Sequence, residues 1–302
     1  MIIENMASKC VVGIGELLWD CFPTYRRMGG APANFAYHVS QFGFNSVVVS
    51  AVGDDQEGGA LIKELKSHNL DSCVEKVDLP TGTVDVNITD ANDPQYIINT
   101  EVAWSAIPFS NKLAAIAKNC CTVCFGTLAQ YGCRTRETIG MLLDSVPAEC
   151  FKIYDVNLRK SAGKALFSDE TILSSISRCN VLKLNADELD YVTELFSLNK
   201  EESIELRGRR LMALYPNVKL LIVTMGTDGS LVFSGSETSF MATPKVVVKD
   251  AVGAGDSFTG AFIGSVLNGK TIREAHQIAV KVSAYVCTQP GAMPVVPEEI
   301  KK

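Results

Sequence analysis

Apolar residues recur along the chain in two patterns, and the elements that these patterns predict follow one another in a regular order. Runs rich in β-branched and other apolar residues, such as residues 10–20 and 219–224, predict buried strands. Residues 46–70 predict a strand, a turn and an amphipathic helix. From Asn111 onward strands and helices alternate, which implies a parallel sheet with crossover helices. We therefore expect an α/β fold.

Residues 81–107 interrupt this alternation. Two alternating runs, TGTVDVNIT and QYIINTEVAW, flank the turn-forming segment DANDP, a pattern typical of a β-hairpin. A hairpin inserted into an α/β chain is a candidate lid, an element that excludes water from a reaction beneath it.

Composition limits the class of protein. The chain has 302 residues, of which 47% are hydrophobic and 21% charged, as in a soluble globular protein with a substantial core. No apolar run approaches the ~18 residues needed to span a membrane, and the first residues lack an export pattern. A net charge of −6 without a Lys/Arg-rich block argues against nucleic acid as the main partner. We expect a cytoplasmic protein.

One cysteine pattern raises the alternative of a metal or redox site. The ten cysteines are expected to be reduced and mostly buried. Cys121 and Cys124 form a single C-x-x-C, with Cys120 beside it, in an apolar run that predicts a buried strand. Residues three apart on a strand point to opposite faces, so these thiols should not share a metal or a bond. A structural role is favoured.

The stretch KDAVGAGDSF near the C-terminus carries the strongest chemical signal. Residues 245–248 predict a strand, and the residues from Ser257 have helical spacing as far as Asn268-Gly269. Gly253, Ala254 and Gly255 should therefore precede a helix, with unpaired N–H groups that can bind an anion. Asp256 adds a carboxylate in the first turn, which suits the base of a phosphoryl-transfer enzyme. Helix capping is the alternative role for Asp256.

A second glycine-rich turn lies near the N-terminus. Gly29-Gly30 precedes Pro32, which suits the start of a helix, and apolar residues then follow at helical spacing as far as Gly43. Asn34 falls in the first turn, where its amide can face a ligand. Upstream, Gly13-Ile14-Gly15 lacks the third glycine of a dinucleotide fingerprint, which disfavours an oxidoreductase.

Together these stretches resemble the PfkB (ribokinase-like) family of sugar kinases. The C-terminal string matches the family signature D-x-x-GAGD-x-F, and GGAPAN matches the N-terminal GG-x-x-x-N. The resemblance covers essentially the whole chain and implies a single domain, residues 1–302, with the ribokinase-like three-layer αβα sandwich. It also implies a mostly parallel central sheet and a small β-sheet lid, with lid strands at roughly 21–30 and 81–105.

The resemblance also implies roles for individual residues. Asp256 would be the base and the amides of residues 253–255 the anion-binding donors, with ATP and Mg²⁺ as cofactors. Residues implied or favoured as sugar ligands are Asp20, Gly30, Asn34, Trp104 and Arg159. Of these, Arg159 follows a predicted strand in the motif D-x-N-x-R, with a surface loop as its alternative. For Trp104, the alternative to a sugar contact is a position in the core or in a dimer interface.

Nucleotide and metal sites are implied by further motifs. Asn185 and Glu188 match N-x-x-E, linked to Mg²⁺ and phosphate positioning, and the same spacing is typical of a helix capping box. Residues of the implied ATP site are Asn185, Glu188, Thr224, Gly226, Gly229, Gly253, Gly255 and Ser283. Asp250 and Gly291 would form a monovalent-cation site, with K⁺ as the candidate ion.

The fructokinase branch fits the sequence better than the ribokinase branch. Ala31-Pro32 replaces the Gly-Lys step associated with ribokinases, and YDVNLR is typical of fructokinases. We expect phosphorylation of D-fructose to fructose 6-phosphate in a homodimer joined through the lid. Ribose, tagatose, 2-keto-3-deoxygluconate or a nucleoside remain alternatives, because pocket geometry decides among hydroxylated substrates. A catalytically inactive sugar- or nucleotide-binding regulator is the alternative from another class.

Overall fold

The structure, a computed structural model, describes residues 9–88 and 94–302. Within these residues a nine-stranded sheet forms the centre of the molecule. Its strands, in spatial order, are β15 (Glu237–Met241), β14 (Ser230–Ser234), β13 (Leu220–Thr224), β12 (Val181–Asn185), β9 (Phe151–Asp155), β8 (Cys120–Gly126), β1 (Cys10–Ile14), β4 (Asn45–Gly53) and β5 (Asp71–Val77). The pairs β13–β14 and β14–β15 are antiparallel and the others parallel.

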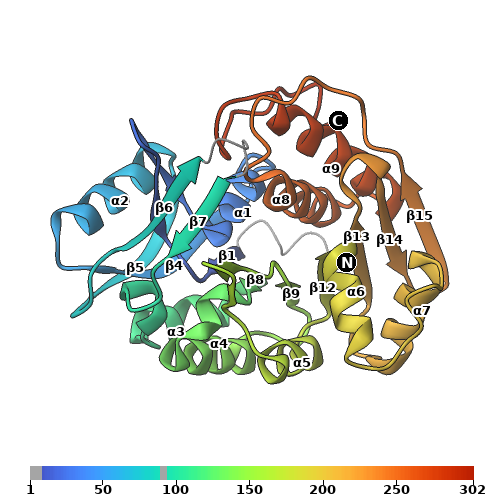
Figure 1. Ribbon diagram of the computed structural model, residues 1–302, viewed down its shortest axis with the longest axis horizontal. Coiled ribbons are helices and arrows are strands. Elements are labelled where there is room, and N and C mark those ends of the chain that lie inside the picture. Colours follow the sequence, from blue (N-terminus) through green and yellow to red (C-terminus); the bar gives the residue numbers. More distant parts are fainter. Residues whose placement is uncertain (1–8, 89–93) are drawn as a thin grey trace.

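Helices cover both faces of this sheet (Figure 1). One layer contains α3 (Asn111–Lys118), α4 (Cys133–Ser145), α5 (Asp169–Arg178), α6 (Ala186–Glu194) and α7 (Ile204–Leu214). The other contains α1 (Ala31–Ser40), α2 (Gln56–Ser67), α8 (Ala254–Leu267) and α9 (Ile272–Cys287). The expected three-layer αβα sandwich with a mostly parallel sheet is confirmed. Among the described residues, no helix is long and apolar enough to cross a membrane.

A second sheet lies beside the carboxyl-terminal edge of the central strands. In the described ranges it has four strands, in the order β3 (Arg26–Gly29), β2 (Leu18–Cys21), β6 (Gly82–Ile88) and β7 (Pro94–Ile98). The strands β6 and β7 pair as the antiparallel hairpin that the sequence predicts. Most of the DANDP turn between them lies outside the described residues. A short hairpin, β10 (Lys160–Ser161) and β11 (Lys164–Ala165), follows β9.

Two predicted strands differ from the structure. Residues 10–20 form two strands rather than one, because Gly15, with φ of 149°, directs the chain from β1 in the central sheet to β2 in the small sheet. Residues 245–248 form no strand and are exposed, with Val247 85% accessible. Their β-branched side chains favour a strand only where a partner strand and a covered face are present.

The orientation predicted for the C-x-x-C cysteines is wrong. Cys121 and Cys124 both pack in the core layer beneath α1, α8 and α9. The cause is a bulge in β8, where Cys10 pairs with Cys120 but Val11 pairs with Thr122, so that one residue is skipped and the alternation shifts. All ten cysteines are unpaired thiols, and the described residues contain no group of His, Cys, Asp and Glu arranged to hold a metal.

Candidate active site

A cavity of about 910 Å³ lies between the carboxyl ends of the central strands and the small sheet. In an open α/β sheet this edge is the usual place for a ligand. The sequence-predicted residues that line it are Asp20, Gly30, Asn34, Arg159, Asp250, Gly253, Ala254, Gly255 and Asp256. Segments from both ends of the chain therefore meet at one site, as the two glycine-rich motifs predict.

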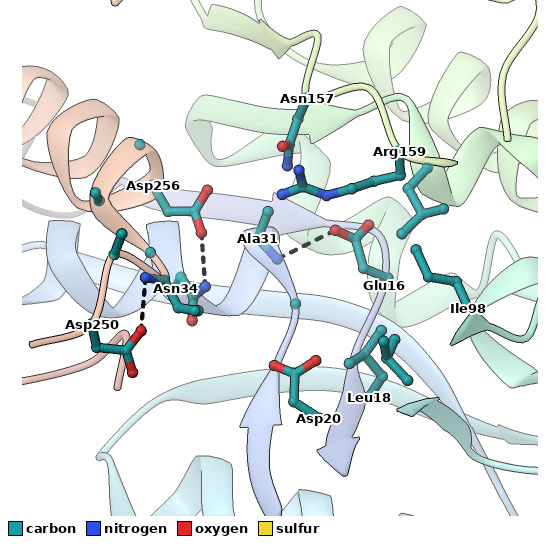
Figure 2. Close-up of a pocket in the computed structure, with 18 of the residues that line it drawn as sticks. Glu16, Leu18, Asp20, Ala31, Asn34, Ile98, Asn157, Arg159, Asp250 and Asp256 are labelled. Atoms are coloured by element: carbon teal, nitrogen blue, oxygen red, sulfur yellow. Dashed lines mark hydrogen bonds between the residues drawn. The ribbon is translucent and has the colours of Figure 1, made fainter. Parts of the chain in front are cut away.

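Asp256 and Asn34 meet across this cavity. The Nδ2 of Asn34, in the first turn of α1, donates a hydrogen bond of 2.7 Å to Oδ2 of Asp256, in the first turn of α8 (Figure 2). Burial raises the pKa of Asp256 to about 6, with the nearby Asp155 carboxylate adding to the shift and the Asn34 hydrogen bond opposing it. A carboxyl with this pKa is ionised at neutral pH and still basic enough to accept a proton.

The turn before α8 has the geometry expected of an anion site. Gly253 is the N-cap residue and adopts the left-handed conformation, with φ of 77°. A Cβ at this position would lie 2.5 Å from Cβ of Ala292, so only glycine fits. Within the described residues the amides of Gly255 and Asp256 donate no hydrogen bond, whereas the Ala254 amide donates to Ala251 O. Two amides at the positive end of α8 are therefore free for an anion.

Ser283 supports this turn from α9. Its hydroxyl donates a hydrogen bond of 2.9 Å to the carbonyl oxygen of Ala254. This contact places Ser283 behind the anion-binding turn, and it fixes the position of the turn relative to α9.

Lys183 is a site residue that sequence reasoning missed. It lies on β12, lines the cavity, and forms an ion pair of 3.1 Å with Asp155 at the end of β9, with both side chains buried. Burial alone would lower the Lys183 pKa, but the carboxylates of Asp155, Glu188 and Asp256 outweigh it and raise the pKa. Its ammonium lies 3.0 Å from where a Cβ of Gly255 would be, so it adds a positive charge beside the free amides. The only sequence signal was a lysine inside an apolar strand.

The sugar-binding candidates Asp20 and Arg159 approach the cavity from different elements. Asp20 belongs to β2 of the small sheet, and Arg159 follows β9 and reaches across toward Asn157 (Figure 2). Burial raises the pKa of Asp20 to about 6, although Arg159 and Arg27 oppose the shift. The cavity thus contains several carboxylates together with a guanidinium.

Trp104 does not belong to the cavity. It lies in the short 3₁₀ helix η2 (Ala103–Ala106), is fully buried under the small sheet, and packs with Leu18, Val84 and Leu128. This burial favours its alternative role in the core, and a contact between Trp104 and a sugar ring stays a prediction. An isolated tryptophan in a hairpin segment carries no signal that separates the two roles.

Comparison with known proteins decides the family. The model of the pfkB family of carbohydrate kinases matches residues 13–299. The chain belongs to this family. It is an ATP-dependent sugar kinase with the ribokinase-like fold.

Sequence relatives of this sugar kinase include enzymes with two different acceptors. It is 29% identical to the ATP-dependent 6-phosphofructokinase of Thermoanaerobacterium thermosaccharolyticum, over 95% of this chain and 91% of the relative. It is 26% identical to fructokinase-1 of Oryza sativa subsp. japonica, over 97% of this chain and 96% of the relative. The general activity is shared, and the acceptor differs between these relatives.

Solved structures agree with the kinase fold. The fructokinase of Xylella fastidiosa with bound ATP superposes with a TM-score of 0.83 at 19% identity, covering 96% of this chain and 95% of that one. A double mutant of the fructokinase of Vibrio cholerae O395, bound to fructose, ADP and potassium ion, gives a TM-score of 0.79 at 21% identity, covering 96% of both chains.

The N-x-x-E residues of the kinase form the capping box that their spacing predicts. Asn185 caps α6, its side chain accepting from the Glu188 amide, and Glu188 accepts from the Asn185 amide and, at 2.8 Å, from the Leu158 amide. Glu188 is buried next to Lys183 and Asp155. Mg²⁺ binds through one or two carboxylates, waters and substrate phosphates. Because both Glu188 oxygens already accept from backbone amides, capping is compatible with an indirect role in positioning the metal.

The residues of the predicted nucleotide loop lie at the next strand. Thr224 ends β13, and Gly226 and Gly229 adopt positive φ of 57° and 124° around the 3₁₀ helix η4 (Gly226–Asp228). Thr224 pairs with Asn185 in the sheet register, so this loop follows directly on from the capping box. In the described ranges these residues do not line the 910 Å³ cavity; they lie at the same sheet edge.

The predicted monovalent-cation site fits poorly. Asp250 and Gly291 do meet, since the Gly291 amide donates to Oδ2 of Asp250. However, the Arg27 guanidinium from β3 binds the same oxygen at 2.8 Å, and the Val252 amide binds Oδ1 at 3.0 Å. The positive partner of Asp250 is thus an arginine of the small sheet, Arg27.

Proposed function

We propose that this kinase transfers the γ-phosphoryl group of ATP to the 6-hydroxyl of D-fructose, giving fructose 6-phosphate. The observation that carries the proposal is the 2.7 Å hydrogen bond between Asn34 and Asp256 in one cavity. It joins the proposed sugar-binding motif to the base beside two free amides of the anion-binding turn.

The acceptor hydroxyl would lie against Asp256. In the proposed reaction, Asp256 takes the hydroxyl proton while the oxygen attacks the γ-phosphorus, and the bond to the β-phosphate oxygen breaks to release ADP. The Asn34 amide holds the carboxylate in place. Asn34 lines the cavity, and its Oδ1 is a buried polar atom that has no partner among the described residues. It is available to accept a second hydroxyl of the sugar.

The transferring phosphoryl group would bind at the turn before α8. The amides of Gly255 and Asp256 and the Lys183 ammonium would stabilise the negative charge that develops on it, a type of contact worth about 2.7–4 kcal/mol of barrier per donor. Mg²⁺, when bound with ATP, neutralises phosphate charge, and Glu188 with Asn185 would position it indirectly. Arg159 would orient the sugar or a phosphate oxygen from the far side.

The acceptor is tested by measuring ADP release with Mg-ATP and one of fructose, ribose, tagatose, 2-keto-3-deoxygluconate or adenosine. Turnover fastest on fructose, and lost in Asp256→Asn, supports the proposal. Faster turnover of another sugar would refute fructose but retain the role of Asp256. ATP binding without turnover of any acceptor would instead favour a regulatory protein.

Fructose 6-phosphate is the second candidate acceptor, because the 29% identical relative is an ATP-dependent 6-phosphofructokinase. The two acceptors differ by a phosphate dianion, so the charge around the acceptor should distinguish them. Including fructose 6-phosphate in the same assay tests this directly.

A further inference from the structure

Glu16 is a buried carboxylate that neither the sequence motifs nor the proposed reaction uses. It lies in the short link between β1 and β2, lines the cavity, and is only 5% exposed. Figure 2 shows it on the cavity wall between Arg159 and Asp20. Its position is fixed by the backbone, because Gly30, with φ of 123°, lets the Glu16 carbonyl approach to 2.2 Å from where a Cβ would lie.

Only one oxygen of this carboxylate has a partner in the described part of the chain. Oε1 accepts a hydrogen bond of 3.3 Å from the Ala31 amide, at the first residue of α1, where the helix dipole favours a negative charge. Oε2 is buried and has no partner among these residues. A buried carboxylate oxygen without a hydrogen bond is costly and calls for a ligand or an ordered water.

The unsatisfied atoms of two cavity-lining residues point to the same kind of ligand. Six buried side-chain polar atoms have no partner among the described residues, and of the residues that carry them only Glu16, through Oε2, and Asn34, through Oδ1, belong to the cavity wall. Oδ1 of Asn34 and Oε2 of the ionised Glu16 are acceptors, so a ligand that satisfies both in this state donates hydrogen bonds. Hydroxyl groups of a sugar do this, whereas a phosphate dianion has no proton to donate.

We propose that Glu16 is a further substrate-binding residue, whose Oε2 accepts a hydrogen bond from a hydroxyl of the sugar other than the one that is phosphorylated. This rests on the proposed function and adds to it a residue that recognises an uncharged, polyhydroxylated acceptor. Glu16, Asp20 and Asp256 place three carboxylates around the acceptor. Lys183, which also lines the cavity, is already paired with Asp155. Arg159, Lys160 and Lys249 are the cations that remain among the described lining residues.

The protonation of Glu16 is compatible with a hydroxyl partner. Burial raises the pKa of Glu16 to about 7, with the Asp256 carboxylate adding to the shift and the Ala31 amide and Arg159 opposing it. A hydroxyl can donate to the ionised carboxylate and can also accept from the protonated one, so the contact persists across neutral pH. A second anionic group near Glu16 would raise the pKa of Glu16 further.

The test combines variants of Glu16 with acceptors that lack single hydroxyls. Glu16→Gln keeps the volume and an oxygen for the Ala31 amide, and Glu137→Gln on α4, in the opposite helical layer, is the matched control. At saturating ATP, Glu16→Gln should raise KM for fructose about 10- to 100-fold, the range of a charge-assisted hydrogen bond. The effect on kcat and on KM for ATP should be smaller, and the control should match the wild type.

Deoxy analogues identify the hydroxyl. Among 1-, 3- and 4-deoxyfructose, one should be a poor substrate of the wild type and should lose little further in Glu16→Gln, since the same contact is already absent. The proposal would be overturned if every analogue showed the same decrease in kcat/KM, relative to fructose, in both proteins. An unchanged KM for fructose in Glu16→Gln, with a thermal midpoint like that of the wild type, would also overturn it.

Fructose 6-phosphate tests the acceptor that this inference shares with the proposed function. We expect kcat/KM for fructose to exceed that for fructose 6-phosphate by about 100-fold or more, and Glu16→Gln to narrow this ratio by removing a negative charge. Preference for fructose 6-phosphate would overturn both the uncharged substrate class and D-fructose as the acceptor, while leaving the kinase reaction intact. If the wild type turns over no sugar, calorimetric binding of fructose to wild type and Glu16→Gln decides the role of Glu16 on its own.

Discussion

Replacing Asp256 with asparagine should inactivate the kinase and stabilise its fold. The Asp256→Asn side chain has nearly the same shape and keeps an oxygen that can accept the Asn34 hydrogen bond, but it cannot take a proton. We expect kcat to fall by about 10²–10⁴, the usual contribution of a general base.

The size of the stabilisation follows from the pKa. The pKa of Asp256 is raised from its ordinary value of 3.8 to about 6 in the folded protein. The folded state therefore disfavours the ionised form of Asp256. At about 1.36 kcal/mol per pKa unit, the ionised carboxylate lowers the free energy of unfolding by about 3 kcal/mol. Asp256 retains some exposure to the cavity, so this figure is an upper bound on the gain from a neutral side chain.

The direction of the pKa shift determines how the stability gained in Asp256→Asn depends on pH. The pKa of Asp256 is higher in the folded protein than in the unfolded chain. Above about pH 6 the carboxylate is ionised in both states, and the full electrostatic cost to the fold is present. This cost disappears as the pH falls below 3.8, where the carboxylate is protonated in both states. Urea unfolding at pH 8 should show Asp256→Asn to be more stable than the wild type by up to about 3 kcal/mol, with about half that gain at pH 5. A variant that is less stable than the wild type, or whose gain does not change between these pH values, would refute the electrostatic reasoning.

Three other perturbations test separate parts of the site. The kcat/KM of the wild type should rise with pH through about 6 as Asp256 loses its proton, and a rate independent of pH between about 5 and 8 would count against Asp256 as the base. Gly253→Ala should lower both kcat and the thermal midpoint, because a Cβ would meet Ala292 at 2.5 Å in a left-handed conformation; normal activity in this variant would show that the turn can relax. Arg27→Gln removes the guanidinium from Asp250, so the ratio of its rate in K⁺ to its rate in Na⁺ should be larger than that of the wild type. Equal ratios in the two proteins would contradict the assignment of Arg27 as the cation that pairs with Asp250.

Local signals in the sequence predicted much of the fold and part of the site. The helix α1 follows from Pro32 and the apolar spacing after it, and the start of α6 follows from the Asn185–Glu188 capping box. These features depend on residues within a few positions of one another. Asp256 and Asn34 could be brought together only through the family resemblance, since the contact joins residues far apart in the chain.

The features that the sequence did not predict depend on contacts between distant segments. Glu16 and Lys183 lie within apolar strand patterns, and their roles become visible only once the Ala31 amide and Asp155 are placed beside them. Residues 245–248 have strand propensity but no partner strand within the described ranges. The bulge that turns Cys121 inward depends on the register of β8 against β1, which propensity does not encode.

The hydrogen bond between Asn34 and Asp256 also has a consequence for folding. It joins residues 222 positions apart, and α1 and α8, which carry them, pack side by side on the central sheet (Figure 1). Contacts of such long sequence separation form slowly, because the intervening chain must be ordered first. During synthesis the ribosome releases α8 after every described strand of both sheets, so the base reaches the sugar-binding helix among the last events of folding. Recovery of phosphoryl transfer during refolding should therefore lag behind recovery of helix and sheet signals.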